Sequence, residues 1–333
     1  MSDKNRRIIA FLLLMVLTVL LFPCKGYAQD IKSAPFQIDF IDVGQGDAAL
    51  VKCDGHYMLI DGGSASKSSL IYSYLKARSI RYIDVIIATH EHEDHVGGLP
   101  GALNYANVGA AFCSVTDSDS KAFRNSKKYL AAQGKSIYVP KAGDSFYLGS
   151  ALVTILAPVV AGTGPNNNSI VLKIAYGGVS FLFAGDAEWE EENSIAGYGE
   201  LLRSTVLKVG HHGGGSSTGY QFLKAVAPRY AVISVGAGNS YGHPDENTLS
   251  RLRDAGTQVL RTDLQGDIVC TTDGNNITFN VQRNANINTL ANAGPGQNQN
   301  KSYLVPFGNS AQNNQASVPD RSVSDTRDNQ VTR

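Results

Sequence analysis

The chain has 333 residues, with 29 Lys and Arg against 29 Asp and Glu, so its formal net charge is zero. This balance gives no support for tight, purely electrostatic binding to nucleic acid. The four cysteines lack the paired spacing of a thiolate metal site, so a metal site built on cysteine is not expected.

Both ends of the chain differ in composition from the part between them. Residues 1–28 combine a basic start, an apolar run of 15 residues (8–22) and small residues at the end, which predicts a cleaved signal peptide and an exported protein. An uncleaved membrane anchor is the alternative, although the run is shorter than the roughly 20 residues of a membrane span. After cleavage no stable membrane span is expected, and the remaining chain has 25 basic and 28 acidic residues.

Residues 283–333 are rich in Asn, Gln, Ser and Ala and have no sustained apolar periodicity. Such a segment buries too little surface to offset its ordering entropy, which predicts a disordered polar tail. The segment 29–282 is therefore expected to form one domain.

In chain order, this domain alternates short apolar runs with amphipathic stretches. The apolar runs predict strands, and the sequence Gly177-Gly178 predicts a hairpin between two of them. The amphipathic stretches predict helices, and many strands with helices interspersed suggest two sheets between helix layers. The expected strands are 37–43, 48–52, 57–60, 85–88, 151–156, 169–175, 179–184, 206–209, 230–235, 258–261 and 267–271, and the expected helices are 66–78, 118–133 and 245–255.

Three histidines and an aspartate follow the strand predicted at 85–88, in the sequence THEHEDHVGG. Imidazole nitrogen and carboxylate oxygen are ligands of zinc and similar divalent ions. One short loop can serve two adjacent metals, with His90 and His92 on one and Asp94 and His95 on the other. A solvated, histidine-rich loop is the alternative, but only seven histidines occur in the whole chain, which favours the metal site.

Other polar residues stand at the ends of predicted strands, where they can meet in one site. Asp61 and His243 are equally well explained as turn residues. Asp186 is the best candidate for a carboxylate shared by two metals, and either His211 or His212 is the candidate for a further imidazole.

These motifs together resemble a known family. THEHEDHVGG is similar to the HxHxDH signature of the metallo-β-lactamase superfamily. Further motifs resemble the ComEC-type competence branch of it, and the resemblance implies a four-layer αββα sandwich, a metallo-β-lactamase-like α/β fold. These motifs are FIDVGQGDA (40–48), LIDGG (59–63), NNNSIVL (166–172), FLFAGD (181–186), VLKVGHHG (206–213) and NSYGHP (239–244).

The resemblance also implies roles for individual residues. Two divalent ions, Zn or Mn, are expected, and one of them is expected to be weakly held because residues 166–169 lack a histidine that the superfamily commonly has there. The implied metal ligands are His90, His92, Asp94, His95, Asp186 and His211, with His212 or His243 as rivals of His211. Catalytic roles are implied for Asp94, Asp186, His212 and His243, and substrate-binding roles for Asn166, Ser169, Lys208 and Gly213.

The function expected from these features is a secreted metal-dependent hydrolase of phosphodiesters, a nuclease with DNA as a candidate partner. A metallo-hydrolase of another ester, lactone or amide is the first alternative, and the near-neutral charge favours it. A non-catalytic binding module with the same fold is the second. The sequence leaves the oligomeric state open.

Overall fold

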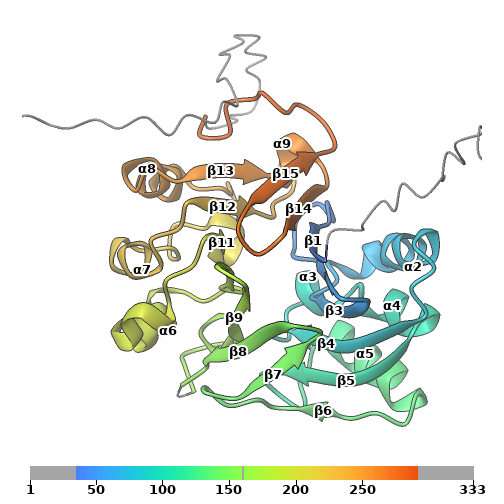
Figure 1. Ribbon diagram of the computed structural model, residues 1–333. Helices are drawn as coiled ribbons and strands as arrows, with labels where there is room; N and C mark the ends of the chain where they lie inside the picture. The colour runs from blue at the N-terminus through green and yellow to red at the C-terminus, as the bar shows by residue number, and fades with distance from the viewer. Residues whose placement is uncertain (1–34, 160, 292–333) are drawn as a thin grey trace, which may run out of the picture.

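The computed structural model describes residues 35–159 and 161–291. Within them, two mixed β-sheets pack face to face, and helices cover the outer face of each sheet (Figure 1). This arrangement confirms the predicted four-layer sandwich. The predicted signal peptide and residues 292–333 of the predicted tail lie outside the described residues. In the described ranges, no helix has both the length and the apolar character that crossing a membrane requires.

The first sheet has eight strands in the order β15-β14-β1-β2-β3-β4-β5-β6. Apolar residues of three helices pack on its outer face, and these helices lie together on one side of the molecule in Figure 1. The strands are β1 (Phe36–Phe40), β2 (Ala49–Cys53), β3 (His56–Ile60), β4 (Tyr82–Ala88), β5 (Asn107–Cys113), β6 (Ile137–Tyr138), β14 (Ile268–Thr272) and β15 (Ile277–Val281), and the helices are α2 (Ser68–Ala77), α4 (Leu99–Tyr105) and α5 (Lys121–Ala132).

The second sheet has seven strands in the order β13-β12-β11-β10-β9-β8-β7. Its helices lie on the opposite side of the molecule (Figure 1). The strands are β7 (Ser145–Leu148), β8 (Ala151–Ala157), β9 (Val171–Tyr176), β10 (Val179–Phe183), β11 (Val206–Lys208), β12 (Tyr230–Ile233) and β13 (Gln258–Arg261), and the helices are α6 (Trp189–Ile195), α7 (Tyr220–Val226) and α8 (Glu246–Asp254).

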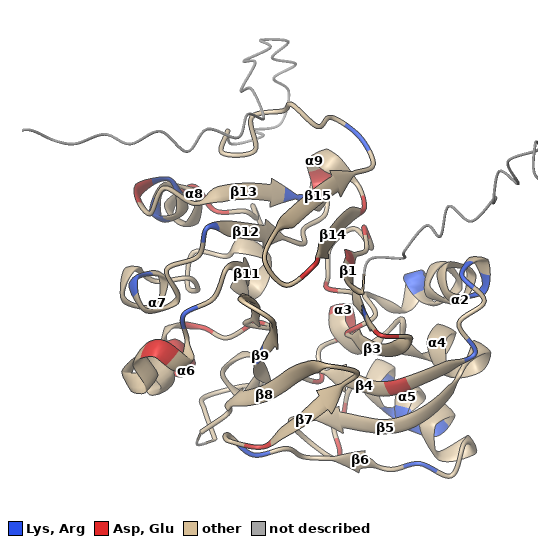
Figure 2. Ribbon diagram, in the orientation of Figure 1, with Lys and Arg blue, Asp and Glu red and all other residues tan. Residues whose placement is uncertain are grey.

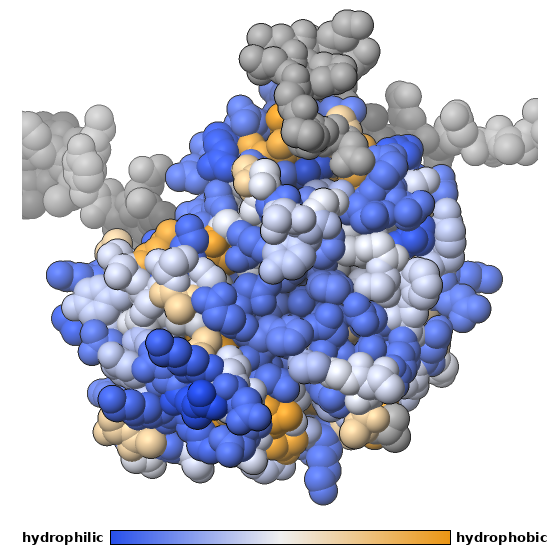
Figure 3. Space-filling model, turned by 180° about the vertical axis from the view of Figure 1, so that it is seen from behind, coloured by the Kyte–Doolittle hydropathy of each residue, from blue (hydrophilic) through white to orange (hydrophobic). Residues whose placement is uncertain are grey.

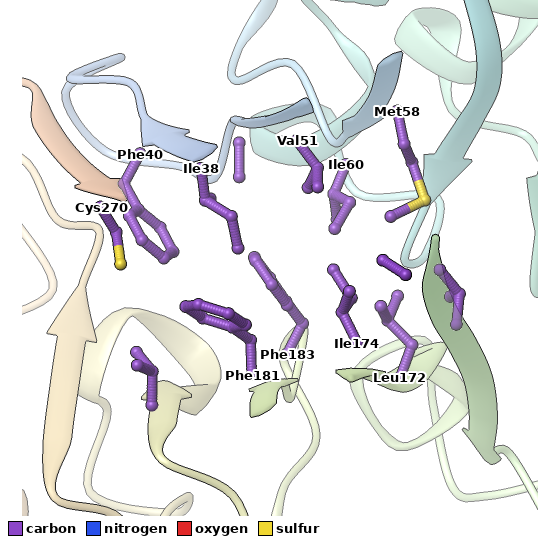
Figure 4. Packing of buried hydrophobic residues seen from close by; sticks show 14 of the residues in the cluster. Ile38, Phe40, Val51, Met58, Ile60, Leu172, Ile174, Phe181, Phe183 and Cys270 are labelled. Carbon is purple, nitrogen blue, oxygen red and sulfur yellow. The ribbon is translucent and has the colours of Figure 1, made fainter. Parts of the chain in front are cut away.

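The central core lies between the two sheets, where apolar side chains from both inner faces interdigitate (Figure 4). Phe40 of the first sheet stacks on Phe183 of the second with ring centroids 5.8 Å apart. Each large side chain buried in this way contributes roughly 1.5–3 kcal/mol to folding. Most apolar side chains are buried, either in this core or between each sheet and its helices. The face of the molecule seen in Figure 3 is accordingly mainly hydrophilic, with small and separate hydrophobic patches.

The parallel parts of both sheets determine where the site forms. β3 pairs parallel to β4, and β10 pairs parallel to β11. The carboxyl ends of parallel neighbours meet at one edge of a sheet, so the residues that follow these strands come together there. Asp61 follows β3 and the histidine loop follows β4, whereas Asp186 and His211-His212 follow β10 and β11.

Several elements were not predicted from the sequence. The strand β5 has the sequence NVGAAFC, whose small residues have weak strand preference, and it forms because it pairs along its length with β4. The strands β7 and β15 are edge strands with half-exposed residues and a weak apolar pattern. Among the helices, α4, α6 and α7 were also missed, and each has only seven residues.

The beginning of the predicted tail packs on the domain. Arg261 is fully buried, and its guanidinium donates to the carbonyl oxygens of Thr289 (3.2 Å) and Ala291 (3.0 Å). Thr289 in turn donates its hydroxyl to the carbonyl oxygen of Val259. Residues up to 291 therefore pack on the domain, beyond the predicted boundary at 282, because they supply acceptors to the buried Arg261, whose charge is paired with Asp263.

Candidate metal centre

The histidine loop leaves β4 and enters the short helix α3 (Glu93–Val96). The His90 ring centroid lies 4.2 Å from that of His95 and 4.6 Å from that of His92. His90 and His95 are completely buried. The sequence prediction that these side chains converge on one point is thus supported by the geometry of the loop.

Two groups of candidate ligands share this centre. The first group is His90, His92 and Asp186, and the second is Asp94, His95 and His212. Within each group the ligand atoms lie within 4.8 Å of one another.

Asp186 lies between the two groups. Its Oδ2 is 3.7 Å from Nε2 of His90 and 3.2 Å from Nε2 of His95, while its Oδ1 is 3.6 Å from Nε2 of His212. A carboxylate with imidazoles facing both of its oxygens is suited to link two neighbouring cations. This position agrees with the sharing role predicted for Asp186.

Buried polar atoms without hydrogen-bond partners point into the same space. They are Nε2 of His95, Nε2 of His212 and Oδ1 of Asp186. Leaving such atoms unpaired is costly, and imidazole nitrogens with carboxylate oxygens form the ligand set of zinc and manganese sites. The residues present therefore fit two adjacent divalent ions.

His95 is oriented from behind by Asp61. Its Nδ1 is 2.9 Å from Oδ2 of Asp61, and the carboxylate also accepts hydrogen bonds from the backbone nitrogen and the hydroxyl of Thr89. A carboxylate on the far ring nitrogen holds a metal-binding histidine in one orientation. Asp61, which the sequence left undecided, thus lies where it positions a ligand.

His212 has a similar support, made by Asp47 and Lys208. Oδ1 of Asp47 is 3.1 Å from Nδ1 of His212, and its Oδ2 is 2.8 Å from Nζ of Lys208. Burial acts to raise the pKa of Asp47, but the charges of Lys208 and His212 outweigh it and lower that pKa. An oxygen of Asp47 also lies within 4.8 Å of ligand atoms of His95 and Asp186, but both of its oxygens are engaged by Lys208 and His212.

The structure does not support the substrate-binding role predicted for Lys208. It is buried and donates to the carbonyl oxygen of Val209 as well as to Asp47. Because its ammonium points into the protein, it is not presented to a substrate. The location favours a role as the counter-ion of Asp47.

The adjacent residues His211 and His212 point in different directions. Both have left-handed backbone angles, with φ of 50° and 53°, which cost of order 1–3 kcal/mol each in residues other than glycine. This turn puts His212 against Asp94, whose Oδ2 is 3.2 Å from its Nε2. His211 instead lies with Nδ1 3.3 Å from Oε1 of Glu188. The geometry therefore gives His212 the ligand position that the sequence assigned first to His211.

The remaining predicted site residues have distinct environments. The hydroxyl of Ser169 accepts a hydrogen bond from the backbone nitrogen of Asp186 at 3.0 Å, so Ser169 positions the shared carboxylate. Asn166 has its amide nitrogen 3.5 Å from Nε2 of His211. Gly213 has a φ of 83° and faces Pro244 so closely that a Cβ would lie 2.7 Å from that of the proline. Gly213 is thus a packing residue of the turn, and His243 stands beside it, half-buried.

Asp47 and Glu188 were not singled out from the sequence. Asp47 is part of the FIDVGQGDA motif, in which an aspartate directly after Gly44-Gln45-Gly46 was the signal that the sequence offered; the structure adds that it is buried. Glu188 lies two residues after Asp186, and its Oε1 also accepts a hydrogen bond from the hydroxyl of Ser216 at 2.8 Å. Neither residue has a local pattern that reveals its partner.

The electrostatics of the centre are dominated by its carboxylates. Burial acts to lower the pKa of His212, but Asp186 and Asp47 raise it to about 10, and Asp186 and Asp61 raise that of His95 in the same way. By contrast, burial and the neighbouring His95 hold the pKa of His90 well below its usual value. Without metal, His95 and His212 are therefore protonated at neutral pH, and a bound cation has to displace those protons.

Comparison with known proteins identifies the family. The sequence profile described as "Metallo-beta-lactamase superfamily" matches residues 41–237, which is more than half of the chain. The chain belongs to the metallo-β-lactamase superfamily.

Individual proteins with similar sequences indicate which branch of the superfamily the chain resembles. ComE operon protein 3 of Bacillus subtilis is 31% identical over 260 residues, covering 71% of this chain and 33% of that protein. Competence protein ComA of Neisseria gonorrhoeae is 32% identical over 227 residues, covering 68% of this chain and 30% of that protein. Ribonuclease Z of Clostridium kluyveri is 44% identical over 63 residues, covering 19% of this chain and 20% of that protein.

The resemblance to the ComEC-type competence branch is confirmed by these relatives. The chain spans about a third of the length of the two competence proteins that it matches. It is accordingly a metallo-β-lactamase-fold hydrolase related to one part of those larger proteins.

Proposed function

We propose that the protein is a metal-dependent phosphodiesterase, and more specifically a nuclease that acts on DNA outside the cytoplasm. The observation that carries the proposal is the position of Asp186 between two groups of imidazole and carboxylate ligands. Two adjacent ions, when bound, lower the pKa of water and stabilise charge on both the attacking and the leaving oxygen of a phosphodiester. The names of relatives as competence proteins and as a ribonuclease support the same substrate class.

The residues of the chain supply the remaining functions. His90, His92, Asp94, His95, His212 and Asp186 would hold the ions, and Asp94 and Asp186 would also bring negative charge to them. Burial and the nearby His211 and His212 lower the pKa of His243 to about 4, so its ring is neutral near pH 7. Its Nδ1 has no hydrogen-bond partner among the described residues. Because that nitrogen is enclosed by protein atoms, the catalytic role predicted for His243 stays a prediction.

A hydrolase of another ester, lactone or amide is the competing proposal, and the basic residues favour it. Lys208 is buried on Asp47, and Lys173 donates to the carbonyl oxygens of Leu201 and Arg203 at 3.0 and 2.7 Å. In Figure 2 the Lys and Arg residues are spread over several helices, among them α2, α5 and α8. Recognition of a polyanion would therefore depend on the metal ions and on contacts other than a basic patch.

One comparison of substrates tests the proposal. The protein, loaded with zinc or with manganese, is assayed on single-stranded DNA, double-stranded DNA, bis-nitrophenyl phosphate and a chromogenic lactam. We expect cleavage of phosphodiesters to dominate and to be lost in Asp186→Asn, whereas Asp117→Asn, at an exposed aspartate on the surface, leaves it intact. Dominant turnover of lactone or lactam substrates, with the diesters untouched under both metals, refutes the nuclease proposal.

Export is part of this proposal and depends on residues 1–28. N-terminal sequencing of the protein recovered outside the cytoplasm is expected to begin at Gln29. Recovery of the intact N-terminus in a membrane fraction refutes cleavage and supports an anchored form.

A further inference from the structure

A series of aromatic rings leads from the candidate metal centre to the surface. The ring centroids of His212 and His211 are 6.3 Å apart, and those of His211 and His243 are 5.3 Å apart. Tyr241 then stacks on His243, with a centroid distance of 5.8 Å and an interplanar angle of 29°. Tyr241 is 70% exposed. The series thus ends, three ring-to-ring steps from His212, in a large ring that is open to solvent.

The loop that carries Tyr241 is fixed by Asn239. Oδ1 of Asn239 accepts hydrogen bonds from the backbone nitrogens of Tyr241 and His243, both at 3.1 Å. Its amide nitrogen donates to the carbonyl oxygens of His243 (2.6 Å) and Gly236 (2.9 Å). The backbone nitrogen of Gly236 in turn donates a hydrogen bond to the side-chain oxygen of Gln45. An exposed ring on so fixed a backbone is preorganised, which reduces the entropy lost when a ligand binds to it.

The composition of the chain indicates why such a ring is useful. The net charge is zero, and Lys208 and Lys173 are engaged by groups of the protein itself. Base stacking offers a polynucleotide affinity that does not depend on ion pairs. Stacking of bases on aromatic side chains contributes roughly 1–3 kcal/mol per base and does not depend on sequence, because every base has an aromatic face.

On the basis of the proposed nuclease function, we propose that Tyr241, backed by His243, is a stacking subsite for an unpaired base of a single-stranded polynucleotide. Bases inside a duplex are already stacked on both faces, so the subsite selects single strands or frayed ends. Stacked nucleotides rise by about 3.4 Å each along a strand. The base on Tyr241 therefore belongs to a nucleotide only a few steps from the phosphate at the metal centre.

The test compares two oligonucleotides of equal length, one of thymidines and one in which every position is abasic. For the metal-loaded wild-type protein, we expect KM to be about 5- to 150-fold lower on the thymidine strand, from the stacking energy of one base. Tyr241→Leu removes the ring and is expected to make the two KM values equal. Tyr241→Phe keeps the ring and is expected to keep the difference.

A matched control is Tyr147→Leu, because Tyr147 on the edge strand β7 is 72% exposed and lies outside this series of rings. The control is expected to keep the wild-type difference. Equal KM values for the wild type, or a difference that persists in Tyr241→Leu, overturn the stacking subsite while leaving the nuclease proposal in place. A wild-type protein that cleaves neither strand nor any other phosphodiester refutes the proposed function itself.

Discussion

The two groups of candidate ligands that share Asp186 are supported very differently by the surrounding protein. In the second group, Asp61 holds the far nitrogen of His95, and the pair of Asp47 and Lys208 holds that of His212. In the first group, the far nitrogen of His90 has only the hydroxyl of Thr89 at 3.3 Å, and the hydrogen bond recorded for the His92 ring is to His90. Carboxylates behind histidine ligands raise metal affinity, so we expect the second group to be the stronger site.

The ligand count points the same way. The second group together with Asp186 offers four protein ligands, whereas the first offers three. The turn 166–169, where the superfamily resemblance leads one to expect a further histidine, supplies Asn166 and Ser169 instead. From this difference we expect a divalent ion to be held more tightly by the second group than by the first.

The largest effect is expected from removing a ligand of the stronger group. His95→Ala is expected to abolish the tightly held metal equivalent and to lower turnover more than about 100-fold, because a metal ligand matters at least as much as the residues behind it. His92→Ala is expected to lose only the weaker equivalent. Elemental analysis after dialysis measures both, and full metal in His95→Ala contradicts the assignment.

The support of the stronger group provides the next prediction. Asp47→Ala leaves the ammonium of Lys208 buried without its partner, which costs about 3–5 kcal/mol of folding stability, and it releases His212, which lowers metal affinity about 10- to 100-fold. Thermal unfolding and metal titration measure the two effects. Asp117→Asn breaks only an exposed ion pair with Lys127 and serves as the control, with no measurable change expected in either quantity. An unaltered unfolding temperature in Asp47→Ala shows that the buried pair has been misread.

A smaller effect on folding stability is expected at Glu191 on α6, whose backbone nitrogen donates to the side chain of Asn167 in the turn 166–169. Both of its carboxylate oxygens are buried without hydrogen-bond partners among the described residues, and burial raises its pKa to about 9. Because the pKa is higher in the folded than in the unfolded protein, the stabilising contribution is complete below about pH 4.5 and is lost as the pH rises towards 9.

Glu191→Gln removes this pH dependence with little change of shape. We expect the variant to match the wild type at pH 4 and to unfold at a higher temperature at pH 8, where each kcal/mol of difference corresponds to about 2–4 °C in a domain of this size. Thermal unfolding across this range measures the difference. A variant that is less stable than the wild type at pH 8 means that the carboxylate has a charged partner in solution.

The smallest effect on the centre is expected from shortening the C-terminus. A chain ending at Ala291 keeps the acceptors of Arg261 and is expected to bind metal and unfold like the full chain. A chain ending at Val281 loses them and is expected to unfold at a lower temperature without a change in metal stoichiometry, because every residue of the two ligand groups, and His243 as well, precedes residue 244. Loss of metal from the shorter chain contradicts the separation of these two regions.

Local patterns were sufficient for much of the fold and part of the site. Strands with strong apolar character, such as β1, β4 and β10, were predicted to within a few residues, and so was α8, which has Asp245 as its N-cap. Weaker elements were missed because their stability comes from pairing, as in β5, or from packing on a sheet, as in α7. The extent of the domain was also underestimated, since the polar segment after residue 282 is held by the buried Arg261 far from it in sequence.

The sequence by itself determined the fold family and the candidate ligands that lie within one loop, because the spacing of His90, His92, Asp94 and His95 is a local property. Only the tertiary structure decided which of two adjacent histidines faces the candidate metal centre and whether Lys208 is open to a substrate. Both depend on Asp47, which lies 165 residues before His212. A contact over such a distance, together with a left-handed turn in two histidines, exists only after the two sheets have packed, and no local pattern contains it.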